Sequence, residues 1–132
     1  GRSSSSREAP AVKFAIETES RYVPRESDPD NDRYVFAYTI TIRNQGDAAG
    51  QLLNRHWWVT NGQGEVQEVE GPGVVGQQPR IPPGESFSYT SAALLATPVG
   101  AMHGHYEFQD DDGERFEVEI PAFSLSVPAM VH

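Results

Sequence analysis

The stretch "RYVFAYTITIRN", residues 33–44, decides the fold. Its large apolar side chains occupy every second position, at Tyr34, Phe36, Tyr38, Ile40 and Ile42. Successive side chains of a β-strand point to opposite faces, so a period of two indicates a strand rather than a helix. Because the alternate positions are mostly polar, this strand is expected to be antiparallel, with one face on a core and the other in water.

The same period recurs on both sides of this stretch. Further short strands are predicted around "VKFAIE" (12–17), "LLNRHWWVT" (52–60), from Val66, and in "ESFSYTS" (85–91), "MHGHYEF" (102–108) and "RFEVEI" (115–120). Turn residues separate them, notably Asn61-Gly62 and "DDDG" at 110–113. The pattern predicts an all-β fold: an immunoglobulin-like or fibronectin type III-like β-sandwich of about seven antiparallel strands. With no cysteine in the chain, a disulfide-linked antibody-type domain is excluded.

The apolar positions change phase near the end of the chain. Phe116, Val118 and Ile120 are even-numbered, whereas Phe123, Leu125 and Val127 are odd-numbered. A bend or bulge at Pro121–Ala122 would return both sets to the core. The alternative is that the second segment packs elsewhere on the sandwich.

Length and composition predict one domain, spanning residues 11–128. The serine-rich residues 1–10 are interpreted as a flexible tail or an expression-vector remnant, without the apolar segment of a signal peptide. No apolar run approaches the ~18 residues of a membrane span, so membrane insertion is not expected. The lack of cysteine favours a cytoplasmic location.

The net charge of −9 is unevenly distributed. Charges balance through residue 60, whereas only Arg80 and Arg115 offset eleven acidic residues after it. Such a surface repels phosphate backbones, so nucleic-acid binding is not expected. The acidic half either serves solubility or attracts cations or a basic partner.

The segment "GPGVVG" has the G-x-G-x-x-G spacing of a dinucleotide-binding loop, with glycines at 71, 73 and 76. In that motif a helix follows the glycines and holds the pyrophosphate. Here "QQPRIPPG" follows, and its prolines oppose a helix. The segment is therefore predicted to be a tight connection between strands. An anion-binding loop formed by Gly71, Gly73, Gly76 and Arg80 is the alternative.

Histidines suggest a metal site. His103 and His105 share one strand face, and His56 lies on the polar face of the strand expected beside it. Imidazole nitrogens are common zinc ligands, so His56, His103 and His105 form the candidate metal set. The competing interpretation is three unrelated surface histidines.

No nucleophile, base and acid occur at a spacing that indicates catalysis, so neither an enzyme nor a cofactor is expected. Binding residues are more plausible. Trp57 alternates with Leu53 and Val59 and is predicted to be buried, whereas Trp58 lies among polar residues. Exposed tryptophan is enriched at binding hot spots. Trp58 is therefore a candidate for an interaction surface.

Val74 and Val75 form a second candidate interaction surface. They are adjacent in a glycine-rich loop, where both cannot easily be buried. Together they would expose an apolar patch to a partner.

Several longer segments resemble the ApaG family: "VEGPGVVGQQP" (69–79), "IPPGESFSYTS" (81–91), "TPVGAMHGHY" (97–106) and "IPAF" (120–123). The similarity runs from about Val12 to Leu125. Asn61 is a small departure, because the family often has aspartate there. The resemblance implies a fibronectin type III-like sandwich with no established catalytic residues.

Related domains in F-box and polymerase-interacting proteins resemble protein-interaction modules, and the bacterial family is loosely linked to divalent-cation efflux. The gene often neighbours that of a diadenosine tetraphosphatase. The expected function is therefore a non-catalytic module that binds a protein partner. The alternative is a domain that senses a divalent metal, or a nucleotide or pyrophosphate bound at "GPGVVG".

Overall fold

A computed structural model describes residues 12–128 as eight strands and two short 3-10 turns. The predicted tail at residues 1–10 lies outside this range. The turns are η2 (Pro24–Glu26) and η3 (Pro29–Asn31). The strands are β1 (Phe14–Tyr22), β2 (Tyr34–Asn44), β3 (Gly50–Asn61), β4 (Val66–Pro72), β5 (Arg80–Ile81), β6 (Ser86–Leu95), β7 (Val99–Asp110) and β8 (Arg115–Ser126).

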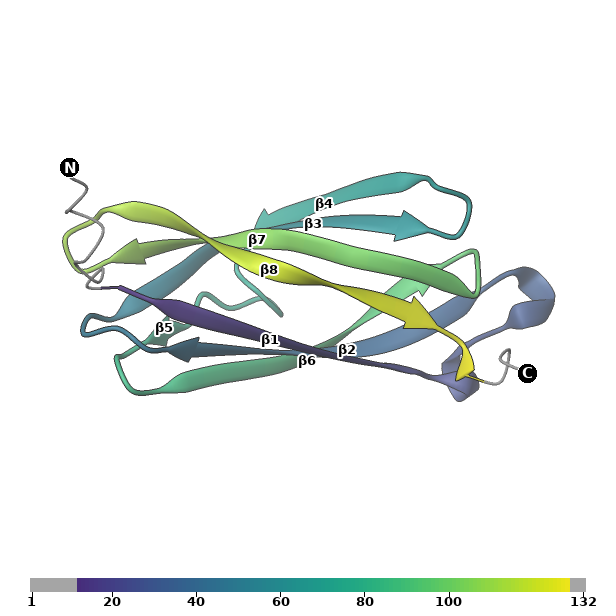
Figure 1. Ribbon diagram of the computed structural model, residues 1–132, viewed down its shortest axis with the longest axis horizontal. Helices are drawn as coiled ribbons and strands as arrows, with labels where there is room; N and C mark the ends of the chain where they lie inside the picture. Colours follow the sequence, from purple (N-terminus) through teal and green to yellow (C-terminus); the bar gives the residue numbers. More distant parts are fainter. Residues whose placement is uncertain (1–11, 129–132) are drawn as a thin grey trace, which may run out of the picture.

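The strands form two antiparallel sheets that face each other (Figure 1). One sheet has the order β1-β2-β6, and the other has the order β4-β3-β7-β8, with the two-residue β5 added to β3. The predicted fibronectin type III-like β-sandwich is confirmed, with seven main strands and the short β5 as an eighth. No helix in residues 12–128 is long and apolar enough to cross a membrane.

The core lies between the sheets and uses the alternation read from the sequence. On β2, Phe36, Ile40 and Ile42 are almost completely buried, and their neighbours on the strand are more exposed. Trp57 is buried as predicted, against Tyr38 and Phe123. The apolar stripes of both sheets therefore meet in one core.

The predicted bulge at Pro121–Ala122 is present. Met102 of β7 pairs with Phe123, whereas Gly104 pairs with Ile120, so two residues of β8 oppose one of β7. Both Pro121 and Ala122 are exposed. The extra residue changes the phase of β8 and directs both apolar sets inward, as a bulge does.

A second bulge lies in β3 and was not predicted. The β3–β7 register shifts between Leu52 and Asn54, so Leu53 is the extra residue. Leu52 is fully buried instead of Leu53. The expectation that Leu53 shares the inner face of Trp57 was therefore wrong, because the bulge resets the alternation between them.

The hairpins β3–β4 and β7–β8 end in the same kind of turn. Asn61 Oδ1 accepts hydrogen bonds from the amides of Gln63 and Glu65. In the same way, Asp110 Oδ1 accepts hydrogen bonds from the amides of Asp112 and Glu114. The glycine with positive φ is Gly64, and not the Gly62 of the Asn-Gly pair. An Asx residue at the strand end and a later glycine thus close each hairpin.

The sandwich is closed on one side and open on the other. On the closed side β1 packs on β8, where Ser20 Oγ donates to the carbonyl of Ser124. On the other side, β4 and β6 are the edge strands, and they lie apart in Figure 1. The open side exposes the edges of both sheets and gives access to the space between them.

Candidate functional site

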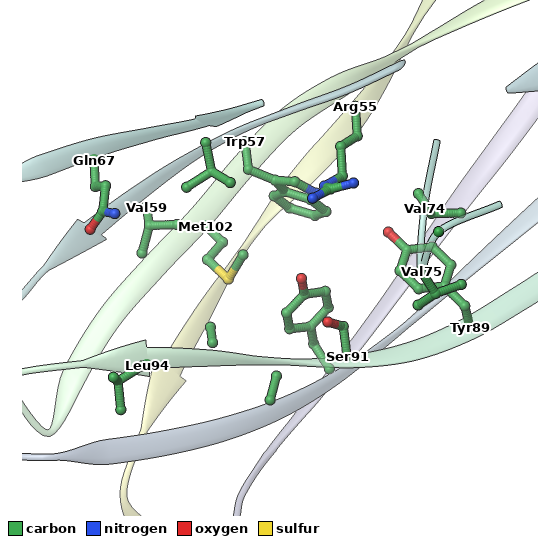
Figure 2. Close-up of a pocket in the computed structure, with 15 residues that line it drawn as sticks. Arg55, Trp57, Val59, Gln67, Val74, Val75, Tyr89, Ser91, Leu94 and Met102 are labelled. Carbon is green, nitrogen blue, oxygen red and sulfur yellow. The ribbon is translucent and has the colours of Figure 1, made fainter. Parts of the chain in front are cut away.

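A cavity of about 400 Å³ lies between the sheets on the open side, and we call it the inter-sheet pocket. Its walls come from β2, β3, β4, β6, β7 and the loop after β4 (Figure 2). Apolar side chains dominate, including Val59, Val69 and Leu94. A concave, mostly apolar recess with a few polar groups is the usual form of a ligand site.

The loop after β4 closes one end of this pocket. The carbonyl of Leu53, in the β3 bulge, accepts hydrogen bonds from the Gly73 amide at 2.8 Å and from Gln78 Nε2 at 2.9 Å. The amides of Val74 and Gln77 each donate to the other's carbonyl and form a two-residue turn. A Cβ on Gly73, whose φ is +61°, would lie 2.0 Å from the Gln77 carbonyl oxygen, so only glycine fits here.

The predicted anion loop stays a prediction, and several of its groups already have partners within the protein. The amides of Gly73, Val74 and Gln77 already donate to protein carbonyls. Arg80 pairs with Asp111 at 2.6 Å. The cation beside the loop is Arg55, whose Nη1 donates to the Gly73 carbonyl at 3.0 Å and whose guanidinium occupies the space left by the missing side chain of Gly71.

Val74 and Val75 do not form the exposed apolar patch that the sequence predicted. Val74 is fully buried in the core, whereas Val75 is 51% exposed. The tight turn sends the two side chains in opposite directions, because Val75 has a φ of +44° and Gly76 one of +75°. Positive φ is rare for a β-branched residue, so Val75 is held in a strained conformation at the rim of the pocket.

A pair of tyrosines lies at the base of the pocket. The hydroxyls of Tyr89 (β6) and Tyr106 (β7) form a short hydrogen bond between the two sheets. Tyr106 is completely buried and Tyr89 is 9% exposed. Burial raises the pKa of both phenols well above the ordinary value, so both hydroxyls remain protonated over the physiological range.

Two further donors surround this pair. Trp57 lies on β3 with its indole N–H near the Tyr89 hydroxyl, yet no acceptor among the described residues forms a hydrogen bond with this buried Nε1. Arg55 is also close enough for its charge to favour ionisation of both phenols. Figure 2 shows the Arg55 guanidinium and the Tyr89 hydroxyl directed toward the interior of the pocket.

The outer face of the larger sheet carries the predicted histidines. His56 and His105 are paired across β3 and β7, with ring centroids 5.2 Å apart. His103 stacks on Trp58, whose ring also stacks on His56. The structure therefore pairs His56 with His105, whereas His103 is the register partner of Trp58.

Trp58 itself is half-buried on this face, as expected. Its ring lies at 17° to that of His56 and at 16° to that of His103. The histidines thus cover much of the indole. A role for Trp58 in contacting a partner stays a prediction.

Two carboxylates that were not singled out in the sequence complete a possible cation site. His56 Nε2 lies 2.5 Å from Glu68 Oε2, and Glu70 is the register partner of His56 on β4. One ligand atom from each of His56, Glu68 and Glu70 lies within 4.8 Å of the others. One nitrogen and two oxygens can serve a divalent cation.

Fold and pocket together define a class: a small antiparallel β-sandwich with a ligand-sized recess between its sheets on the open side. Comparison with known proteins then gives the family. A model of the ApaG domain matches residues 24–110, and the protein belongs to the ApaG family.

The curated relatives span almost the whole chain. Protein ApaG of Salmonella arizonae is 53% identical over 120 residues, covering 91% of this chain and 96% of that protein, and Protein ApaG of Salmonella paratyphi B matches equally well. A solved structure described as an ApaA protein from Bordetella pertussis has a TM-score of 0.87 and 46% identity, with 92% of this chain and 98% of that one covered. The predicted family is therefore confirmed.

Proposed function

We propose that this ApaG protein is a non-catalytic, cytoplasmic binding module that accepts an extended segment of a protein partner along β6. The observation that carries this proposal is the composition of β6, "SFSYTSAALL", which contains neither a charged residue nor proline. Sheet edges are normally guarded by such residues, because an unpaired strand invites pairing with another chain. An unguarded edge is suited to binding a partner by strand addition.

The other edge strands are guarded. Along β1 lie Glu17, Glu19 and Arg21, β4 carries two glutamates and ends in proline, and β8 combines four charged or proline residues. Among the edge strands that the structure describes, only β6 has no charged residue and no proline. A partner strand therefore meets neither repulsion nor a missing donor there.

Exposed apolar residues gather on the same side. Leu94 of β6 is 62% exposed, Val66 of β4 is 60% exposed, and both lie with Val75 around the open side. Exposed clusters of this kind mark interaction surfaces more than isolated residues do. The strain at Val75 supports the same conclusion, because strained residues concentrate at functional sites.

The test begins with a displayed peptide library selected on the protein. A selected peptide should slow amide exchange along β6, mapped by NMR, because the partner's backbone covers that edge. Leu94→Glu should weaken the peptide at least tenfold. Val99→Glu is the matched control, since Val99 is 46% exposed and lies outside the pocket. Protection confined to β1 or β8, or equal loss in both variants, would contradict the proposal.

A second candidate function is binding of a divalent cation on the outer face. The observation that favours it is the convergence of His56, Glu68 and Glu70. It would also fit the loose association of the family with divalent-cation efflux. Binding of Zn²⁺ or Co²⁺, measured by titration, should be abolished in His56→Ala and in Glu68→Gln and unchanged in His103→Ala. Equal binding by all variants would refute this site.

A further inference from the structure

We propose that the inter-sheet pocket recognises a carboxylate of the bound segment, which Arg55, the Trp57 indole N–H and the tyrosine pair receive at its base. This inference rests on the proposed function, because a strand paired with β6 runs along the mouth of the pocket. Tyr89, Ser91 and Ala93 of β6 line that pocket. A side chain or the C-terminal carboxylate of the partner would enter it from the neighbouring strand.

The first observation is the unsatisfied indole. Trp57 is 2% exposed, and its Nε1 lies near the Tyr89 hydroxyl without forming a hydrogen bond of acceptable geometry with any described residue. A buried donor without an acceptor is costly, and native proteins rarely leave one. Trp57 lines the pocket, so a bound acceptor can satisfy this N–H.

The second observation is the charge of Arg55. Its Nη1 is used by the carbonyls of Gly73 and Pro72, which fix the guanidinium but do not neutralise it. No carboxylate of residues 12–128 lies within ion-pair distance of Arg55, and no aspartate or glutamate lines the pocket. The lining of the inter-sheet pocket therefore carries one positive charge and no negative charge. Arg55 also borders a second recess, whose lining includes Glu70, Glu107 and Glu117.

The third observation concerns the hydroxyl protons of Tyr89 and Tyr106. Two hydroxyls carry two protons, and the bond between them uses one. When Tyr106 donates to Tyr89, the proton of the Tyr89 hydroxyl remains available to an acceptor in the pocket, which Tyr89 lines. Because burial raises the pKa of both phenols, neither becomes a competing anion near neutral pH.

Taken together, the base of the pocket offers donors and a positive charge. A ligand with several acceptor lone pairs and one negative charge matches it, which describes a carboxylate. The walls are aliphatic at Val59, Val69 and Leu94, so the carboxylate should be attached to an apolar body. A glutamate within an apolar peptide has this chemistry, as does a peptide that ends in an aliphatic residue with a free carboxylate.

The experiment compares matched probes on the wild-type protein. A blocked peptide of alternating valine and threonine with one central glutamate is titrated beside the same peptide carrying glutamine. A small-molecule arm uses 4-methylpentanoate and 4-methylpentanamide. The protein has two tryptophans, so the Trp57 indole N–H is one of only two such NMR signals and is assigned with Trp57→Phe.

The glutamate peptide is expected to move the Trp57 indole signal and to bind at least tenfold more tightly than the glutamine peptide. Arg55→Met should remove this preference, whereas Arg21→Met, an exposed arginine on β1, should keep it. Trp57→Phe should reduce the preference without changing the protection of β6. Equal affinity of the two peptides for the wild-type protein would overturn the inference, whether or not the variants fold.

The two proposals fail separately. If the peptides protect β6 but leave the Trp57 signal in place, strand addition stands and the carboxylate site is refuted. If 4-methylpentanoate moves the signal and no peptide protects β6, the pocket is a site for small carboxylic acids and the proposed partner mode is refuted. If 4-methylpentanoate and its amide act equally, and so do the two peptides, the charge of Arg55 plays no part in recognition.

Discussion

The hydroxyl pair between the sheets allows a prediction that depends on asymmetry. Tyr89→Phe leaves the Tyr106 hydroxyl without a partner in a completely buried position. The unmet hydrogen bond should cost about 1–3 kcal/mol of unfolding free energy. Tyr106→Phe leaves the Tyr89 hydroxyl, which lines the pocket and can bond to water. That variant should lose only about 0.5–1.5 kcal/mol.

The double variant, in which Tyr89 and Tyr106 are both phenylalanine, leaves no unmatched hydroxyl. It should therefore be within about 1 kcal/mol of the wild type and be more stable than Tyr89→Phe alone. The coupling energy should be at least about 0.5 kcal/mol, because the two groups bond directly to each other.

Urea unfolding followed by tryptophan fluorescence gives all four free energies. Tyr22→Phe is the control, since Tyr22 is half-buried and should change stability by less than about 0.5 kcal/mol. Additive losses, or a larger loss for Tyr106→Phe than for Tyr89→Phe, would refute the reasoning.

Further predictions concern pH, the loop, a turn and the outer face. Burial raises the pKa of Tyr89 and Tyr106 above the value of 10.0 that each has in the unfolded chain, so above pH 10.0 only the unfolded state loses these protons. The free energy of unfolding should therefore fall by up to about 1.4 kcal/mol per pH unit for each phenol, measured by unfolding at stepwise higher pH. Gly73→Ala should cost more than about 1–2 kcal/mol in thermal unfolding, because the left-handed backbone is disfavoured and the new Cβ clashes; unchanged stability would contradict this. Asp110→Ala should cost about 1–2 kcal/mol by removing two hydrogen bonds to turn amides, with Asp112→Ala as the neutral control. Trp58→Ala should retain the β-sheet circular dichroism and peptide binding at β6, since its ring packs on the outer face of the other sheet; loss of either would disprove that placement.

The fold could be predicted because its signal is local. The alternation along residues 33–44 places Phe36, Ile40 and Ile42 in the core without knowledge of any partner strand. The phase change at Pro121–Ala122 was equally visible, and the bulge found there is one of the two outcomes that the sequence left open. Elements whose pattern lies within one strand are therefore readable from sequence.

The site was harder to predict because it depends on register. The Asx turn sets Thr60 opposite Val66, which in turn places Glu70 beside His56. A strand count alone does not give that pairing. Alternation along β3 places Arg55 on the same face as Trp57, two residues away. No spacing along the chain shows that its guanidinium binds the loop after β4. The tyrosine pair joins different sheets, so no spacing along the chain signals it.

The bare edge of β6 also has a consequence for the isolated protein. Two molecules that meet along this strand can join their smaller sheets into one, by the same backbone pairing offered to a partner. Such pairing is closed and symmetric when the strands run antiparallel, so it would end at two copies instead of growing into a fibre. Pairing of two copies would then compete with binding of a partner. The fraction of molecules with a free β6 edge would fall as the protein concentration rises.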